Sequence, residues 1–129
     1  MPFVHIRVAG LDLAPPQVET LQREATRLMA DAMGKKAELT AVLVEIHDAA
    51  RWSIGGRPVP AAAHLDVRVT EGTNSEDEKA EFIRQAHGLL ARVVGPDLPL
   101  ATYVVVDEVP ADAWGYGGST QAMRRAAAA

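Results

Sequence analysis

DEVPADAWGYGG at positions 107–118 decides the fold, because the pattern occurs earlier in the chain as EIHDAARWSIGG at positions 45–56. Both stretches end in a tryptophan followed by a Gly-Gly pair, and the two tryptophans, Trp52 and Trp114, are 62 positions apart. Upstream, HIRVAG at positions 5–10 matches DVRVTEG at positions 66–72 at nearly the same separation. Sequence motifs that recur at the same interval along a chain indicate a tandem duplication.

Each copy of the repeat has the pattern of a β-α-β unit. Residues 3–8 alternate like a strand, residues 15–33 carry an apolar stripe at helical spacing, and residues 39–46 form a β-rich run. In the second copy, Ser75 and Glu78 have the spacing of a capping box, Gly95-Pro96 ends the helix, and residues 102–109 form the closing strand. The two strands of such a unit are parallel and their connection is right-handed.

The duplication predicts an α+β fold with two tandem β-α-β units related by pseudo-two-fold symmetry. We expect a four-stranded mixed sheet with two helices on one face, and a short hairpin at the end of each unit. Residues 1–129 form a single domain made of a first unit (2–61), a second unit (62–125) and a frayed tail (126–129). The apolar runs at 42–44 and 104–106 are typical of strands buried on both faces, so we expect another copy of the protein to cover the second face.

Composition limits the partners of the chain. The 129 residues include 48% hydrophobic and 23% charged residues, as in one globular domain. A net charge of −4 and scattered basic residues argue against binding to nucleic acid. Apolar runs are too short to span a membrane and no signal-peptide pattern is visible, so we expect a cytoplasmic protein. Cysteine is absent, which excludes disulfides and thiol catalysis, and the four histidines lack metal-ligand spacing.

Proline at position 2, β-α-β units of about sixty residues and the closing Trp-Gly-x-Gly-Gly hairpin together resemble the tautomerase superfamily. The tandem arrangement is similar to its fused, double-length 4-oxalocrotonate tautomerase-like members, and the likeness extends to about Arg125. It implies the tautomerase/MIF-like fold and a homotrimer. It also implies an isomerase: a keto–enol tautomerase, without metal or cofactor, that acts on a small anionic 2-oxo acid or its enol.

The resemblance assigns the general base to Pro2, whose nitrogen becomes a free secondary amine when Met1 is removed. An α-amino group titrates at about pH 8, and an apolar pocket or nearby cations lower its pKa further. A base with a pKa near the working pH is well placed to abstract a proton. Taken alone, Pro2 also suits the first position of a strand, where its missing N–H is tolerated. The second unit has Ala63 at the aligned position, so each chain would carry one catalytic proline.

The two arginines with which the best-known family member binds substrate are missing. Leu11 and Thr73 stand at the positions of one arginine, and Leu43 and Tyr103 (or Val104) at the positions of the other. An anionic substrate still needs a partner, and a guanidinium pairs with a carboxylate through two hydrogen bonds. Our substrate-binding candidates are therefore Arg51, Trp52, Tyr103 and Trp114.

Each candidate also has a purely structural interpretation. Arg51 beside the first hairpin is also interpretable as a solvated loop residue, which is the common case for an arginine. Trp52 and Trp114 match the aromatic wall of the family's pocket, but tryptophans also form hairpin cores. The Tyr103 hydroxyl can bond an enolate oxygen or a water, or be satisfied within the sheet. Arg124 and Arg125 lie near the end of the chain, from where they can reach a neighbouring copy, although solvated side chains are the common case.

Two alternative functions stay open beside the tautomerase. One is a hydratase, dehalogenase or decarboxylase of a three-carbon acid on the same fold, in which Tyr103 would position water. The other is a non-catalytic oligomeric binding protein, which the missing arginines motivate, since fold alone does not settle function. Exchange of Pro2 for alanine separates the classes, because an enzyme loses most of its rate and a binder does not.

Overall fold

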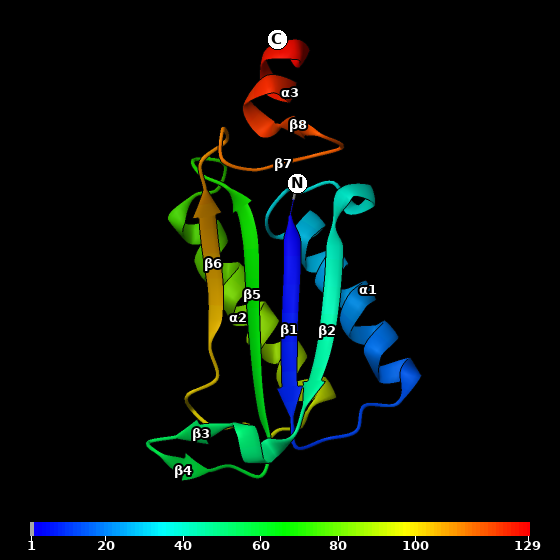
Figure 1. The fold of residues 1–129 in the computed structure, drawn as a ribbon, viewed down its shortest axis with the longest axis vertical. Helices are drawn as coiled ribbons and strands as arrows, with labels where there is room; N and C mark the ends of the chain where they lie inside the picture. The colour runs from blue at the N-terminus through cyan, green and yellow to red at the C-terminus, as the bar shows by residue number, and fades with distance from the viewer. Residues whose placement is uncertain (1) are drawn as a thin grey trace.

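One four-stranded mixed sheet organises the protein, and its computed structural model describes residues 2–129. Met1 lies outside the described residues, so the prediction that it is removed is not tested by the structure. The strands follow the order β2-β1-β5-β6, with bounds β1 (Phe3–Ala9), β2 (Ala41–His47), β5 (Ala62–Thr70) and β6 (Val104–Val109). Helices α1 (Pro15–Asp31) and α2 (Glu76–Val93) lie side by side on one face of this sheet (Figure 1).

The strand pairing confirms the two β-α-β units. β1 pairs in parallel with β2, and β5 pairs in parallel with β6. β1 and β5 join the two units in an antiparallel pair, with Phe3 opposite Arg68 and Ala9 opposite Ala62. The start of β1 therefore lies at the same end of the sheet as the ends of β5 and β6.

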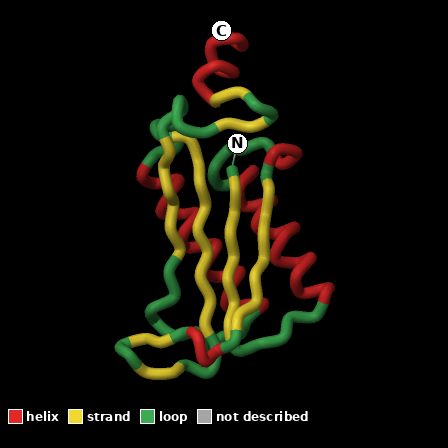
Figure 2. The backbone as a smooth tube through the Cα atoms, viewed as in Figure 1, coloured by secondary structure: helices red, strands yellow, loops and turns green. Residues whose placement is uncertain are grey.

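Each unit closes with a short hairpin, as predicted (Figure 2). The first hairpin consists of β3 (Ser53–Ile54) and β4 (Arg57–Pro58), after a 3₁₀ turn η2 (Ala49–Arg51). The second hairpin consists of β7 (Gly115–Tyr116) and β8 (Ser119–Thr120). Another 3₁₀ turn, η1 (Ala37–Leu39), occupies the start of the run for which the sequence predicts a strand at 39–46. Because of the antiparallel pairing of the units, the two hairpins lie at opposite ends of the sheet.

Local sequence explains where the helices begin. α1 starts with Pro15 and Pro16, which lack the N–H groups that a first turn leaves unbonded. α2 starts at the predicted capping box, in which the Ser75 hydroxyl accepts a hydrogen bond from Glu78 N and the Glu78 carboxylate accepts one from Ser75 N. The core fills the space between the helices and the sheet, and its largest fully buried side chains include Ile6, Leu21, Leu65 and Phe82. Within residues 2–129, no helix is long and apolar enough to cross a membrane.

The face of the sheet away from the helices is open in the single chain. The middle residues of the two apolar runs point to that face, where Leu43 is 44% and Val105 is 40% exposed. Their neighbours Val42 and Val44 pack against the core instead. The prediction that these strands are buried on both faces therefore does not hold within one chain. Whether another copy covers the open face stays a prediction.

The prediction of a frayed end at 126–129 is wrong for residues 126–128. A third helix, α3 (Gln121–Ala128), follows the second hairpin, because the Thr120 hydroxyl caps it by accepting a hydrogen bond from Met123 N at 3.0 Å. Two backbone bonds tie its first turn to the preceding loop: Gln121 N donates to Trp114 O at 3.0 Å, and Ala122 N donates to Ala111 O at 2.9 Å. The helix stands at the same end of the molecule as the start of β1 (Figure 1).

Candidate functional site

Pro2 lies in a hollow at the end of the sheet where β1 begins, which we call the Pro2 pocket. Its volume is about 430 Å³, and its lining consists of Pro2, Phe3, Glu38, Leu39, Thr40, Ala41 and Tyr116. Pro2 is buried, and its carbonyl accepts a hydrogen bond from Ala41 N at 3.3 Å. Three chain segments thus meet at this proline: the start of β1, the turn η1 before β2, and the second hairpin.

A second hollow, the Ala63 pocket, occupies the pseudo-symmetric place at the other end of the sheet. It has a volume of about 250 Å³ and is lined by Trp52, Ser53, Ile54, Gly55, Ala63, His64, Ala101 and Tyr103. Ala63 stands where the Pro2 pocket has its proline, and Ile54 stands where it has Tyr116. The Ala63 pocket therefore has the shape of the repeat but lacks the proline.

The predicted substrate-binding residues do not meet at Pro2 within one chain. Trp52 and Tyr103 line the Ala63 pocket, and Arg51 ends the turn η2 at that same end of the sheet. The two ends are roughly 20 Å apart, because β1 has seven residues and a strand rises about 3.3 Å per residue. Only a neighbouring copy of the chain can bring these three side chains to Pro2.

Trp114 lies at the Pro2 end of the sheet, but its indole N–H is bonded to Thr70 and does not line the Pro2 pocket. Its Nε1–H donates a hydrogen bond to the Thr70 hydroxyl oxygen at 3.1 Å, and Thr70 is buried at the end of β5. Trp114 also lines a shallow hollow beside the second hairpin rather than the Pro2 pocket. This geometry fits the interpretation of Trp114 as a residue that holds the hairpin on the sheet.

Three polar side chains in the Pro2 pocket are not among the sequence candidates: Glu38, Thr40 and Tyr116. Tyr116 follows only from the antiparallel pairing of β1 and β5, which places the closing hairpin of the second unit at the start of β1. Glu38 carries no signal in the sequence, since its position depends on the turn η1 and not on a repeated motif.

The ring and the carbonyl of Tyr116 contact the side chain of Arg124. The Arg124 guanidinium lies over the Tyr116 ring, with its central carbon 3.9 Å from the ring centroid. Its Nε and Nη2 atoms donate to the Tyr116 carbonyl at 3.2 and 2.8 Å. Arg124 is therefore half-buried and held in place, and the expectation of a solvated tail residue is wrong for it.

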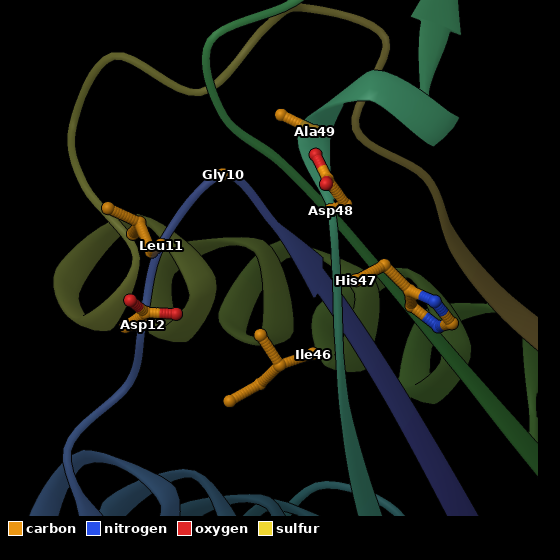
Figure 3. A pocket seen from close by; sticks show the side chains of 7 residues that line it. All are labelled: Gly10, Leu11, Asp12, Ile46, His47, Asp48 and Ala49. Carbon is orange, nitrogen blue, oxygen red and sulfur yellow. The ribbon is translucent and has the colours of Figure 1, made fainter.

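A third hollow lies at the carboxyl ends of β1 and β2 and has a volume of about 430 Å³ (Figure 3). It contains the carboxylates of Asp12 and Asp48, while the ring of His47 points away from both (Figure 3) and bonds Glu45 at 3.0 Å. Among its described lining residues none is a lysine or arginine, and Leu11 stands where the resemblance places an arginine. Two carboxylates without a cation repel an anionic substrate, so this hollow does not suit one.

Lys35 is a part-buried cation near the Pro2 end of the sheet. Burial lowers the pKa of Lys35, whose ammonium donates to the Thr73 hydroxyl at 2.7 Å and interacts with the carboxylates of Glu78 and Glu108. This lysine is thus already balanced by two acids. Within residues 2–129, no group of three or more His, Cys, Asp or Glu side chains is arranged to hold a metal ion.

Comparison with known sequences identifies a family and a relative. A family model described as "Tautomerase enzyme" matches residues 64–123. "Probable tautomerase K2" of Dickeya dadantii (strain 3937) is 34% identical over 59 residues, which are 46% of this chain and 88% of that protein. Pro2 lies in the first unit, outside the residues that the family model matches.

Comparison with solved structures finds the same fold over nearly the whole chain. A fused 4-OT that is described as an asymmetric trimer has a TM-score of 0.79 and 24% identity, with 93% of this chain and 98% of that chain covered. A macrophage migration inhibitory factor-like protein from Entamoeba histolytica has a TM-score of 0.76 and 19% identity, with 92% and 97% covered. The predicted tautomerase/MIF-like fold is confirmed.

Proposed function

Since the chain belongs to the tautomerase family, we propose that it is a cofactor-free keto–enol tautomerase with Pro2 as its general base. The observation that carries this proposal is the contrast between the two pockets of the duplicated fold. One places a buried proline among Glu38, Thr40 and Tyr116, and the other has Ala63 in the same place. The substrate would be a small 2-oxo acid or its enol.

The reaction needs only one proton carrier. With Met1 removed, the Pro2 nitrogen accepts the proton of the enol hydroxyl while the C–O bond gains double-bond character. The same nitrogen then gives a proton to the carbon that has gained electron density, so that the product is the ketone. Substrate and product are isomers, and no oxidant or cofactor takes part. The apolar side chains of Phe3 and Leu39 line the pocket beside this nitrogen, and apolar surroundings disfavour the charged form of an amine.

Tyr116 contributes a hydroxyl to the lining of the pocket, and the other hydroxyl there, that of Thr40, already donates to the Lys36 carbonyl at 2.9 Å. The Tyr116 hydroxyl can stabilise negative charge on the substrate oxygen, as a positioned donor does in other enzymes that form enolates. We propose this role for Tyr116 within the chain. Arg51, Trp52, Tyr103 and Trp114 stay proposed substrate-binding residues, the first three through an adjacent copy.

A homotrimer supplies such an adjacent copy. One apolar patch supports assembly, because Leu100 is fully and Tyr103 is 66% exposed. On the open sheet face, the exposed Leu43 and Val105 lie on the two edge strands, with the polar residues His5 and Asp66 between them. Exposed apolar patches of this kind are typical of interaction surfaces. The fused 4-OT with the same fold is described as a trimer. Sedimentation velocity tests the proposal, because a stable monomer at micromolar concentration would contradict it.

Intact mass spectrometry before and after exposure to bromopyruvate is the direct test of the proposed base. The chain has no cysteine, so the usual competing thiols are absent. We expect a mass without Met1 and one adduct, which peptide mapping places on Pro2. Pro2→Ala should lower kcat/KM for an enolised 2-oxo acid by roughly 10²- to 10⁴-fold, the usual contribution of a positioned base. A retained Met1 or an unchanged rate in Pro2→Ala would favour the binding protein.

Hydration or dehalogenation of a three-carbon acid is the second candidate, and Glu38 is the observation that favours it. A carboxylate in the same pocket as Pro2 can orient a water molecule toward a double bond. Glu38→Gln separates the two reactions. It should abolish activity on a haloacrylate if the chain is a hydratase, and should change tautomerisation much less if it is a tautomerase.

A further inference from the structure

We infer that Arg124 supplies the positive charge that binds the carboxylate of the substrate at the Pro2 pocket, with Tyr116 as its platform. This inference rests on the proposed function and deepens it, because it assigns the anion-binding role that the missing arginines leave open. Neither Leu11 nor Thr73 can fill that role.

The guanidinium of Arg124 is held in position and still has donors to offer. Nε and Nη2 donate to the Tyr116 carbonyl, and the central carbon of the guanidinium lies over the Tyr116 ring. A guanidinium has five N–H donors, so three remain after these two bonds. No carboxylate in residues 2–129 pairs with Arg124. The free donors match the two-bond geometry of a carboxylate.

The backbone beside Arg124 is adapted to this approach. Gly117 has a φ of +58°, and a Cβ added there would lie 2.7 Å from Arg124 Nη2. The counterpart Gly55 in the first hairpin has a φ of +61°, but nothing lies within 4 Å of its added Cβ. Both glycines serve the turn, and only Gly117 also leaves room for a guanidinium.

The arginine occurs only at the pocket that has the proline. The residue aligned with Arg124 in the first unit is Ala62, which is the first residue of β5 and buried. The Pro2 pocket thus differs from the Ala63 pocket in two chemical features together, a candidate base and a cation beside it.

Electrostatics requires a cation at this pocket if the substrate is an anion. The described side chains that line it include the carboxylate of Glu38 and no lysine or arginine. Lys35 lies elsewhere at this end and already interacts with two carboxylates. Arg124 contacts Tyr116, a residue of the lining itself, and is therefore the cation that the structure places against this pocket.

Alkylation of the Pro2 amine by two matched reagents tests the inference without knowledge of the natural substrate. Bromopyruvate and 1-bromopropan-2-one are both α-bromoketones, in which the amine displaces bromide, but only bromopyruvate carries a carboxylate. The rate of adduct formation is measured by intact mass for the wild type, Arg124→Gln, Arg124→Lys and Arg125→Gln. Arg125 is the matched control, because it is the next residue of the same helix and is exposed.

We expect Arg124→Gln to slow labelling by bromopyruvate by roughly 10- to 100-fold, the value of hydrogen bonds to a charged group. The rate of labelling by the neutral reagent should change less than about twofold, because that reagent has no carboxylate to accept hydrogen bonds from the guanidinium. Arg124→Lys should be intermediate, since a lysine keeps the charge without the planar fork. Arg125→Gln should match the wild type with both reagents.

The possible failures are distinguishable. If Arg124→Gln slows both reagents equally, or neither, the inference is wrong and the proposed base stands. If neither reagent labels the wild type at Pro2, the proposed function fails, and the inference fails with it. The ratio of the two rates is the decisive quantity, because a general loss of structure lowers both.

Discussion

Replacement of Thr70 by valine tests how the second hairpin is held on the sheet. The indole N–H of Trp114 donates to the Thr70 hydroxyl at 3.1 Å, and Thr70 is only 4% exposed at the end of β5. Valine has nearly the shape of threonine but no acceptor. The exchange therefore leaves the indole N–H without its partner while the packing around it stays the same.

The expected effect follows from the burial of this bond. A neutral hydrogen bond contributes about 0.5–1.5 kcal/mol net, and a buried donor without a partner costs about 1–3 kcal/mol. Because the bond is part-buried and Trp114 is half-buried, Thr70→Val should lower the free energy of unfolding by about 1 kcal/mol, the low end of the cost of a buried donor without a partner. Thr70→Ser keeps the acceptor and loses one methyl group, so its loss should stay near 0.8 kcal/mol, roughly the transfer free energy of one buried methylene.

A double-mutant cycle isolates the bond from the packing of the two side chains. Trp114→Phe removes the donor and part of the apolar surface, and the variant with both changes should be less destabilised than the sum of the single variants. We expect a coupling free energy of about 0.5–1.5 kcal/mol. Urea unfolding followed by far-ultraviolet circular dichroism gives these values at one fixed chain concentration, because assembly makes apparent stability depend on concentration.

Two results would refute the reasoning. If Thr70→Val and the wild type have the same free energy of unfolding, the hydroxyl does not accept from the indole. If the coupling is zero within about 0.3 kcal/mol, the two side chains act independently. Either result would remove Trp114 as the residue that holds the hairpin and would make its proposed role in substrate binding the better interpretation.

Three further predictions concern glycines and one carboxylate. Gly10→Ala should lower the free energy of unfolding by several kcal/mol or prevent folding, because the added Cβ would lie 2.0 Å from the Pro60 carbonyl oxygen. Gly72→Ala has a similar φ of +79° and open space around the Cβ, so its free energy of unfolding should fall by only about 1–2 kcal/mol in the same urea assay. Gly117→Ala and Gly55→Ala should lose similar stability for their positive φ, but only Gly117→Ala should also slow bromopyruvate labelling, because its Cβ displaces the guanidinium; equal labelling rates would contradict this. A hydrogen bond from Arg84 lowers the pKa of Glu81 from 4.5 to about 2, so this carboxylate stabilises the fold above pH 4.5 and loses its contribution as the pH falls to about 2. The melting temperature of Glu81→Gln should thus lie below that of the wild type at pH 7 and approach it at pH 2, and a constant difference would contradict this.

The fold was predictable because one signal occurs twice. Periodicity alone leaves many four-stranded topologies open, but the 62-residue interval between Trp52 and Trp114 divides the chain into two equal units. Each unit then has only one right-handed β-α-β arrangement. The ends of elements were less well predicted: Leu39 lies in η1 and Tyr103 precedes β6, because turn geometry at these places is not encoded in the apolar pattern.

The candidate site was predicted only in part, because a sequence repeat does not say which ends of the two units meet. Trp52 and Trp114 are equivalent in the repeat, yet they lie at opposite ends of the sheet. Tyr116 and Arg124 became visible only when β1 and β5 were seen to be antiparallel. α3 was missed because its alanine-rich end has no apolar stripe, and its start depends on one cap at Thr120.

The antiparallel joint between the units explains why the two pockets differ. The first hairpin must lead directly into β5, so residue Ala62 enters the sheet and no helix can follow that hairpin. The segment after the second hairpin has no strand to form, and it turns into α3 with Arg124 above Tyr116. The same joint places that segment beside the start of β1 and hence beside Pro2. A chain with this topology can develop a base and an anion-binding arginine together at only one of its two pockets. The anion-binding role proposed for Arg124 therefore belongs to the Pro2 pocket alone.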